Sequence, residues 1–282
     1  MASQLTLSDG RNLDYCISGA KDGFPLLFSH SSPGAWTPVP HLAKACATHG
    51  FMLVTWSRPG FGGSTRRKGR RVVDEVDSVR ALLGHLGRER FAAMGWSAGG
   101  PHALACAAMN GCVAAVVVAG LAPYDAEGLM WAPDISKHVG REGESAIREK
   151  YEARRPGMIS ITAAEIFAGE KPGPDKQAMS DIPGLAQCGE DSFREALKFS
   201  VDGMVDDDLA FREPWGFDVA DIAVPVFLYH GTSDPYVPFT HAQWNASHLG
   251  RVTTHFEEGG GHVSVIQDVD GMLREIIGAM PS

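Results

Sequence analysis

Short apolar runs alternate with amphipathic segments along most of this chain. The apolar runs have the length of β-strands and occupy residues 25–29, 51–56, 90–94 and 113–119. Between them, residues 39–48 and 72–86 have apolar positions at helical spacing. Strands that are apolar on both faces must be covered on both sides, so this rhythm predicts a parallel sheet flanked by helices.

The pattern changes at the start of the chain and again in its second half. Alternating residues near 5–7 and 12–17 predict an antiparallel hairpin. Residues 123–213 are helical and polar, and this stretch is too long for a plain loop. Strands at 224–229 and 251–256 and helices at 239–249 and 266–280 then resume the first rhythm. We therefore expect an α/β core in two parts, residues 1–122 and 214–282, with a helical cap at 123–213.

The segment Gly95-Trp96-Ser97-Ala98-Gly99 lies between a predicted strand and a helix of small residues. A serine between glycines on such a sharp turn has its hydroxyl pointed out of the sheet edge. The following N–H lies at a helix N-terminus, where developing negative charge is stabilised. The pattern predicts a nucleophile only if the chain also supplies a base, an acid and a second oxyanion donor.

Two later loops provide candidates for the acid and the base. Asp234 follows the strand at 224–229, and His262 follows the strand at 251–256 after three glycines. Both positions lie at the carboxyl ends of parallel strands, where sites in α/β folds form. The order Ser97, Asp234, His262 is that of nucleophile, acid and base, in which histidine accepts the serine proton and aspartate stabilises the imidazolium. Other aspartates compete for the acid role: Asp218, Asp221 and the three at 206–208.

The oxyanion of an acyl-transfer intermediate needs two backbone N–H donors. Ala98 is the predicted first donor. The loop after the strand at 25–29 reads His30-Ser31-Ser32-Pro33-Gly34, and it supplies the second, with Ser32 favoured over Ser31. Three neighbouring side chains are candidate substrate contacts, although the tryptophans also suit core packing: His30, Trp36 and Trp96.

Composition narrows the class of partner. The net charge of −9 argues against nucleic acid or an anionic membrane as a partner but does not identify a substrate. The partner that we expect is a small-molecule substrate. We interpret the basic segment from Arg66 to Arg71 as a solvated loop. The histidines show no metal-binding spacing, and we expect no metal and no cofactor. Five scattered cysteines and the lack of a secretory signal favour a cytoplasmic protein without disulfides. The sequence leaves two oligomeric states open, a monomer and a homodimer.

With these residues identified, the chain resembles the α/β-hydrolase fold superfamily, in its cap-bearing branch of serine hydrolases. The segments that carry the resemblance, in chain order, are His30-Ser31-Ser32-Pro33-Gly34, Arg58-Pro59-Gly60-Phe61-Gly62-Gly63-Ser64, Gly95-Trp96-Ser97-Ala98-Gly99-Gly100, His230-Gly231-Thr232-Ser233-Asp234 and Gly260-Gly261-His262. The resemblance implies an eight-stranded, mostly parallel sheet with an antiparallel second strand. It also implies a cap inserted after the sixth strand and a substrate pocket between core and cap.

The chain departs from the family's usual pattern at two positions. Ser31 stands where relatives usually have glycine, and Ser57 where they usually have aspartate. Two consequences of Ser31 remain open: an added hydroxyl at the oxyanion site, or a narrower acyl pocket.

We expect a serine hydrolase that cleaves a small, moderately hydrophobic carboxylic ester through an acyl-enzyme on Ser97. Met130, Trp131 and Phe167 in the predicted cap favour such a substrate. A serine at the elbow argues against dehalogenase and epoxide hydrolase chemistry, which use aspartate there.

Alternatives on the same triad are an aminopeptidase of the proline iminopeptidase type, a C–C bond hydrolase and a cofactor-free perhydrolase; a non-enzymatic receptor is a fourth. The first needs carboxylates in the cap, for which the candidates are Glu142, Glu144, Glu149, Glu165 and Asp181.

Overall fold

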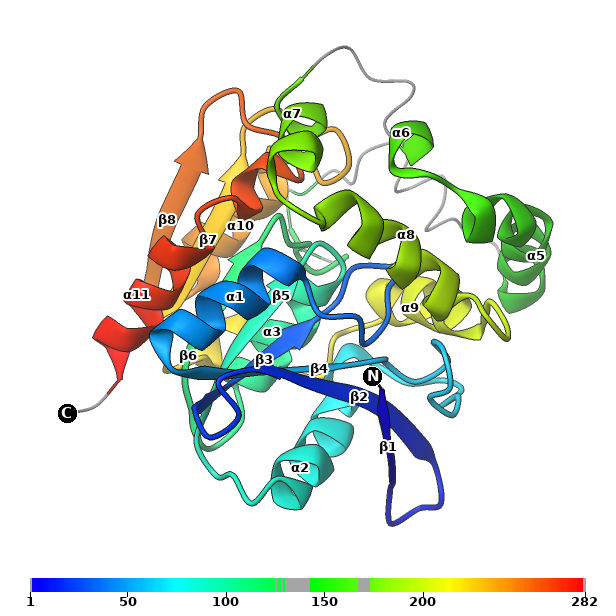
Figure 1. Ribbon diagram of the computed structural model, residues 1–282, viewed down its shortest axis with the longest axis horizontal. Helices are drawn as coiled ribbons and strands as arrows, with labels where there is room; N and C mark the ends of the chain where they lie inside the picture. The colour runs from blue at the N-terminus through cyan, green and yellow to red at the C-terminus, as the bar shows by residue number, and fades with distance from the viewer. Residues whose placement is uncertain (1, 125, 128, 130–142, 167–172, 281–282) are drawn as a thin grey trace.

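The computed structural model describes residues 2–124, 126–127, 129, 143–166 and 173–280 (Figure 1). Within these ranges, eight strands form a single sheet in the order β1-β2-β4-β3-β5-β6-β7-β8. Their bounds are β1 (Ser3–Thr6), β2 (Asn12–Gly19), β3 (Phe24–Ser29), β4 (Phe51–Trp56), β5 (Phe91–Trp96), β6 (Cys112–Val118), β7 (Val226–Gly231) and β8 (Val252–Glu257). β2 pairs antiparallel with β1 and β4, and the remaining pairs are parallel. The predicted mostly parallel sheet is confirmed.

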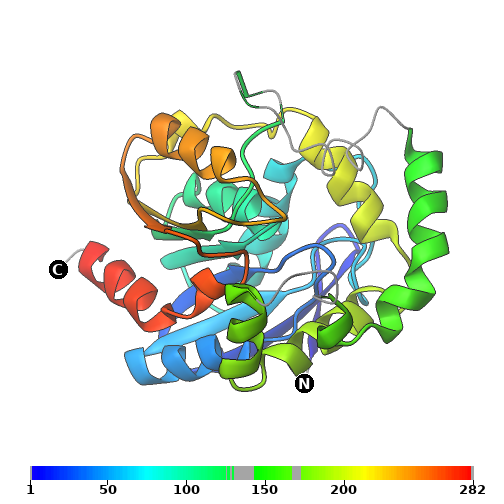
Figure 2. The same ribbon diagram turned by 90° about the horizontal axis from the view of Figure 1, so that it is seen from above.

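Helices cover both faces of this sheet (Figure 2). The helices of the core are α1 (Pro40–His49), α2 (Glu75–His85), α3 (Gly99–Ala107), α10 (Phe239–His248) and α11 (Val269–Ala279). Side chains of α1 and α11 pack in one apolar cluster, and those of α2 and α3 pack in the other. Strand β3 has apolar side chains on both faces. Leu26 and Phe28 belong to the cluster of α1 and α11, and Leu27 belongs to the cluster of α2 and α3.

Two predicted helices are each divided in the structure. The segment at 72–86 begins as the 3₁₀ turn η1 (Val72–Asp74) before α2. The last segment is the 3₁₀ turn η3 (Ser264–Ile266) followed by α11, because the Asp268 side chain accepts the Gly271 N–H and starts a new helix there. None of the helices in the described ranges is long and apolar enough to cross a membrane.

Between β6 and β7 the chain forms a helical insertion, as predicted. We use this name for α5 (Glu144–Ser160), α6 (Ala163–Ile166), α7 (Pro174–Asp181), α8 (Leu185–Ala196) and α9 (Asp202–Arg212). Both views show α5 outside the sheet and its flanking helices (Figures 1 and 2). A third apolar cluster joins the insertion to core loops, with Ile147 and Val205 packed together with Ala35 and Phe61.

Candidate active site

Ser97 stands on the sharp turn between β5 and α3. Its φ of 57° lies in the left-handed region that residues with a Cβ rarely adopt. The flanking glycines make the turn feasible, because a Cβ on Gly95 would overlap the carbonyl oxygen of Gly99, and one on Gly99 would overlap that of Ser29. The Ser97 N–H donates to the Val118 carbonyl at 2.8 Å and ties the turn to β6. The flanking glycines, together with the close approach of Ser29 and the hydrogen bond to Val118, therefore fix the placement of this serine.

The structure brings Asp234 and His262 into contact. His262 Nδ1 lies 2.7 Å from Asp234 Oδ2, and Asp234 Oδ1 accepts the N–H groups of Tyr236 and Val237, each at 2.8 Å. Burial acts to raise the pKa of Asp234, but its electrostatic interaction and hydrogen bond with His262, together with the hydrogen bond from the Val237 N–H, outweigh burial and leave the pKa lowered. An ionised Asp234 accepts a hydrogen bond, so the proton of the imidazole is held on Nδ1.

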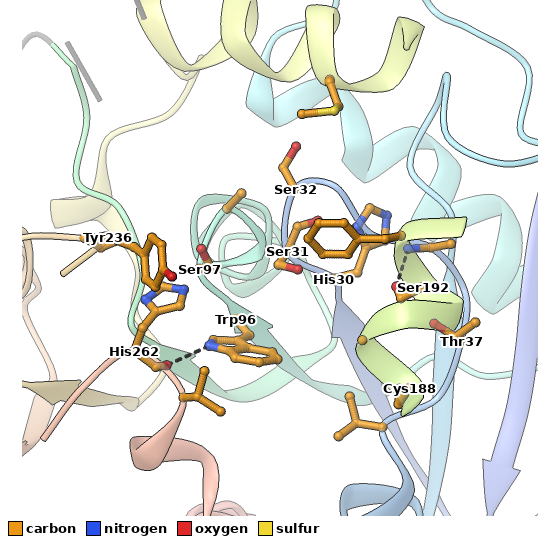
Figure 3. Close-up of a pocket in the computed structure, with 18 of the residues that line it drawn as sticks. His30, Ser31, Ser32, Thr37, Trp96, Ser97, Cys188, Ser192, Tyr236 and His262 are labelled. Carbon is orange, nitrogen blue, oxygen red and sulfur yellow. Dashed lines mark hydrogen bonds between the residues drawn. The ribbon is translucent and has the colours of Figure 1, made fainter. Parts of the chain in front are cut away.

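Figure 3 shows the Ser97 hydroxyl beside the His262 imidazole. The ring of Trp96 stacks near this imidazole with centroids 5.9 Å apart, and the ring of Tyr236 meets it edge-on at 5.3 Å. Trp96 Nε1 also donates to the main-chain oxygen of His262 at 3.1 Å. Trp96, which the sequence marks as a candidate substrate contact, thus holds the histidine loop as well.

Arg58 holds the candidate oxyanion loop from behind. Its buried guanidinium donates to the carbonyl oxygen of His30 and, at 3.1 Å, to that of Ser31. It also pairs with Asp207 of α9 at 2.6 Å. A trans peptide is planar and its C=O and N–H point in opposite directions. Anchoring the Ser31 carbonyl on Arg58 therefore turns the Ser32 N–H away from Arg58.

The pair belongs to a buried charge cluster, defined here as Arg58, Arg70, His102 and Asp207. Burial acts to raise the pKa of Asp207, but the charges of Arg58 and Arg70 hold it far below its usual range. Burial and the Arg58 charge together hold the pKa of His102 well below its ordinary value, so this histidine is neutral. The cluster joins the helical insertion to the candidate oxyanion loop.

His30 is a buried, neutral histidine beside that loop. Its Nε2 accepts the N–H of Arg58 at 3.1 Å, so its Nδ1 carries the proton and donates to the Ser31 carbonyl at 2.6 Å. Burial and the Arg58 charge lower the pKa of His30 well below its ordinary value. The edge of Phe61 packs against its ring, with centroids 5.2 Å apart.

A pocket of about 430 Å³ opens onto Ser97 and has a mostly apolar wall. The predicted site residues that line it are His30, Ser31, Ser32, Trp96, Ser97, Ala98 and His262. Trp36 lies outside this lining, since it packs against the third apolar cluster and its main-chain N–H donates to Ser57 Oγ at 3.1 Å. The competing acid Asp218 is used elsewhere, because it accepts the Ala220 N–H at the start of the 3₁₀ turn η2 (Val219–Asp221).

Sequence reasoning missed a polar pair in this pocket. Asp208 of α9 and Tyr151 of α5 both line it, and the Tyr151 hydroxyl donates to Asp208 Oδ2 at 2.7 Å. Burial raises the pKa of Asp208 to about 7, against the hydrogen bond from Tyr151. Asp208 lies within the run 206–208 considered as competing acids, but no local motif marks it as a pocket residue.

Of the predicted contributors from the cap, only some lie in the described ranges. Met130, Trp131, Glu142 and Phe167 lie outside the described residues. Glu144 pairs with Arg66 at 2.9 Å. No group of three or more metal-binding side chains occurs in the ranges that the structure describes.

Comparison with known proteins places this chain in a family. The alpha/beta hydrolase family model matches residues 23–275, so the chain belongs to this family. It is 24% identical over 267 residues, 92% of each chain, to a non-heme chloroperoxidase of Streptomyces lividans. Two solved structures have the same fold. One is an esterase of Exiguobacterium antarcticum, with TM-score 0.72 and 17% identity over 99% of this chain and 98% of that one. The other is a bromoperoxidase of Bacillus anthracis, with TM-score 0.69 and 18% identity over 99% and 100%.

Proposed function

We propose that this protein is a serine hydrolase that cleaves small, moderately hydrophobic carboxylic esters through an acyl-enzyme on Ser97. The observation that carries the proposal is the Ser97 hydroxyl beside an imidazole whose Nδ1 lies 2.7 Å from the ionised Asp234. The mostly apolar pocket around it suits an ester with short apolar groups. Membership of the alpha/beta hydrolase family supports the same class of reaction.

The proposed reaction has two halves that use the same groups. In the first, Ser97 Oγ attacks the ester carbonyl while His262 Nε2 takes its proton, and the N–H groups of Ala98 and Ser32 stabilise the oxyanion. Collapse of this intermediate expels the alcohol, which takes the proton from His262. In the second, His262 removes a proton from water as the water attacks the acyl group. The acid then leaves, and Ser97 regains its proton.

A panel of p-nitrophenyl esters of different acyl length tests this proposal. Ser97→Ala is expected to lower kcat by about 1,000-fold or more, because the three residues of such a triad act as a unit. The matched control is Ser247→Ala, an exposed serine on α10, which is expected to keep wild-type kcat. Equal turnover by Ser97→Ala and wild type would contradict the proposal.

Labelling by a fluorophosphonate separates an enzyme from a non-catalytic receptor with the same fold. We expect one covalent adduct, on Ser97, and none on the Ser97→Ala variant. A wild-type protein that binds small molecules but forms no adduct would favour the receptor.

Perhydrolysis is the second candidate function, favoured by the similarity to the Streptomyces lividans chloroperoxidase. In that reaction hydrogen peroxide replaces water in the second half, attacks the acyl group, releases a peracid and regenerates Ser97. The peracid then oxidises bromide to hypobromous acid and returns to the carboxylic acid. The test is bromination of monochlorodimedone in acetate, bromide and hydrogen peroxide, with Ser97→Ala as the control. Ester hydrolysis without Ser97-dependent bromination would reject this second function and leave the first intact.

A further inference from the structure

The loop that carries His262 donates hydrogen bonds to a carboxylate of the helical insertion. Asp175, in the first turn of α7, is 2% exposed. Its side chain accepts three consecutive main-chain N–H groups: those of His262 at 2.8 Å, Val263 at 2.7 Å and Ser264 at 2.9 Å. His262 and Asp175 are 87 positions apart in the sequence. The contact therefore joins two parts of the fold that no local motif connects.

These three N–H groups need an acceptor from outside their own loop. They precede and open the 3₁₀ turn η3, and the first N–H groups of a helical segment have no acceptor within it. His262, Val263 and Ser264 are all buried, so water does not replace a missing acceptor without a shift of the loop. An ionised carboxylate is a strong acceptor for such groups. The loop conformation thus depends on Asp175.

The glycine before His262 fits the same contact. A Cβ on Gly261 would overlap the Asp175 carboxylate. The N–H of Gly261 donates to Ser264 Oγ at 2.9 Å, which folds the loop around the carboxylate. The close approach of Asp175 therefore requires a residue without a Cβ at position 261, in addition to any need for loop flexibility.

Hydrogen bonds hold His262 at three of its atoms, and Asp175 makes one of them. Asp234 holds ring atom Nδ1, Trp96 Nε1 holds the main-chain oxygen, and Asp175 holds the main-chain N–H. Together they orient the imidazole beside the Ser97 hydroxyl (Figure 3). We propose that Asp175 is a positioning residue that sets the orientation of His262 through its main chain and makes acyl transfer depend on the docking of α7. This inference rests on the proposed roles of Ser97 and His262.

The experiment compares Asp175→Ala and Asp175→Asn with wild type on the best p-nitrophenyl ester. We expect Asp175→Ala to lower kcat by about 10- to 100-fold, the cost of a misplaced catalytic group, with KM changed less than kcat. Asp175→Asn is expected to be intermediate. Its side-chain oxygen still accepts the N–H groups of Val263 and Ser264, whereas its NH₂ group faces the N–H of His262. The control is Gln177→Ala, because Gln177 lies on the same helix, is exposed and donates a hydrogen bond to Asp181 at 2.8 Å; it is expected to keep wild-type kcat.

Two further measurements distinguish a positioning role of Asp175 from a purely structural role. The low-field proton NMR signal of the His262 Nδ1–H is expected to broaden or vanish in Asp175→Ala, and fluorophosphonate labelling of Ser97 is expected to slow as much as kcat. Both are measured at a temperature where circular dichroism shows the variants folded. If the Asp175 contact only stabilises the fold, Asp175→Ala lowers the midpoint of unfolding and leaves the NMR signal and the labelling rate unchanged.

Ser97→Ala, assayed in parallel, keeps the two proposals distinguishable. Turnover that survives Ser97→Ala overturns the proposed function itself. Turnover that depends on Ser97 but stays within twofold of wild type in Asp175→Ala overturns only the positioning role. If Asp175→Ala does not fold, the positioning role is tested with Asp175→Asn alone. A wild-type kcat together with a wild-type NMR signal in Asp175→Asn overturns the positioning role.

Discussion

Ser31 occupies a position where the resemblance to the family implies glycine, and its hydroxyl is already engaged in a hydrogen bond. Ser31 Oγ donates to the Pro33 carbonyl at 3.2 Å. Its own carbonyl accepts hydrogen bonds from His30 and Arg58. Since Ser31 also lines the pocket, this geometry favours a narrowed pocket over a third oxyanion donor, the two consequences that the sequence leaves open.

Ser31→Ala tests this distinction. We expect kcat on p-nitrophenyl esters to stay within about threefold of wild type, because loss of a true oxyanion donor costs about 100-fold or more. A preference for slightly longer acyl chains is expected from the widened pocket. A fall in kcat of about 100-fold would instead show that the hydroxyl contacts the oxyanion.

At the scale of elements, the basic segment from Arg66 to Arg71 is a bridge between the core and the helical insertion. The prediction of a solvated loop was wrong for two of its arginines. Arg66 pairs with Asp206 of α9 at 2.6 Å, and Arg70 belongs to the buried charge cluster. Acidic side chains of α5 and α9 meet this segment only after the insertion has folded over it. Sequence separation concealed the pairing.

Asp207→Asn measures how much this bridge contributes. The change leaves Arg58 and Arg70 buried without their shared carboxylate, so we expect the free energy of unfolding to fall by about 3–5 kcal/mol. The control is Asp191→Asn, which breaks an exposed pair with Arg194 of similar length, 2.6 Å, and is expected to cost less than about 1 kcal/mol. Urea unfolding measures both. Equal losses in the two variants would contradict the argument.

For the whole molecule, Asp208 makes stability depend on pH. Its pKa is about 7 in the folded protein and near the ordinary 3.8 when unfolded. Between these values the folded state binds a proton that the unfolded state has lost. This contribution to stability therefore falls as pH rises from about 4 to about 7 and is constant above that range.

Asp208→Asn removes this pH dependence. The free energy of unfolding of the variant minus that of wild type is expected to be larger at pH 8 than at pH 5 by about 3 kcal/mol, so the variant gains stability relative to wild type as the pH rises. Urea unfolding at the two pH values measures it. Comparing the variant with wild type at each pH cancels the titration of other groups. An equal difference at both pH values would show that Asp208 titrates normally in the folded state.

The sequence by itself determined the strand order along the chain, the helical insertion after the sixth strand and the serine turn. Each of these depends on residues close together in sequence: apolar runs of strand length, or glycines that admit a sharp turn around Ser97. It also indicated Asp234 and His262, because both follow the ends of predicted strands. Only the tertiary structure decided which residues hold Asp234, His262 and the loops around them in place. Asp175, Asp207 and Asp208 lie on helices without a motif, and their partners lie far away in sequence, so their roles depend on how α7 and α9 dock onto the core.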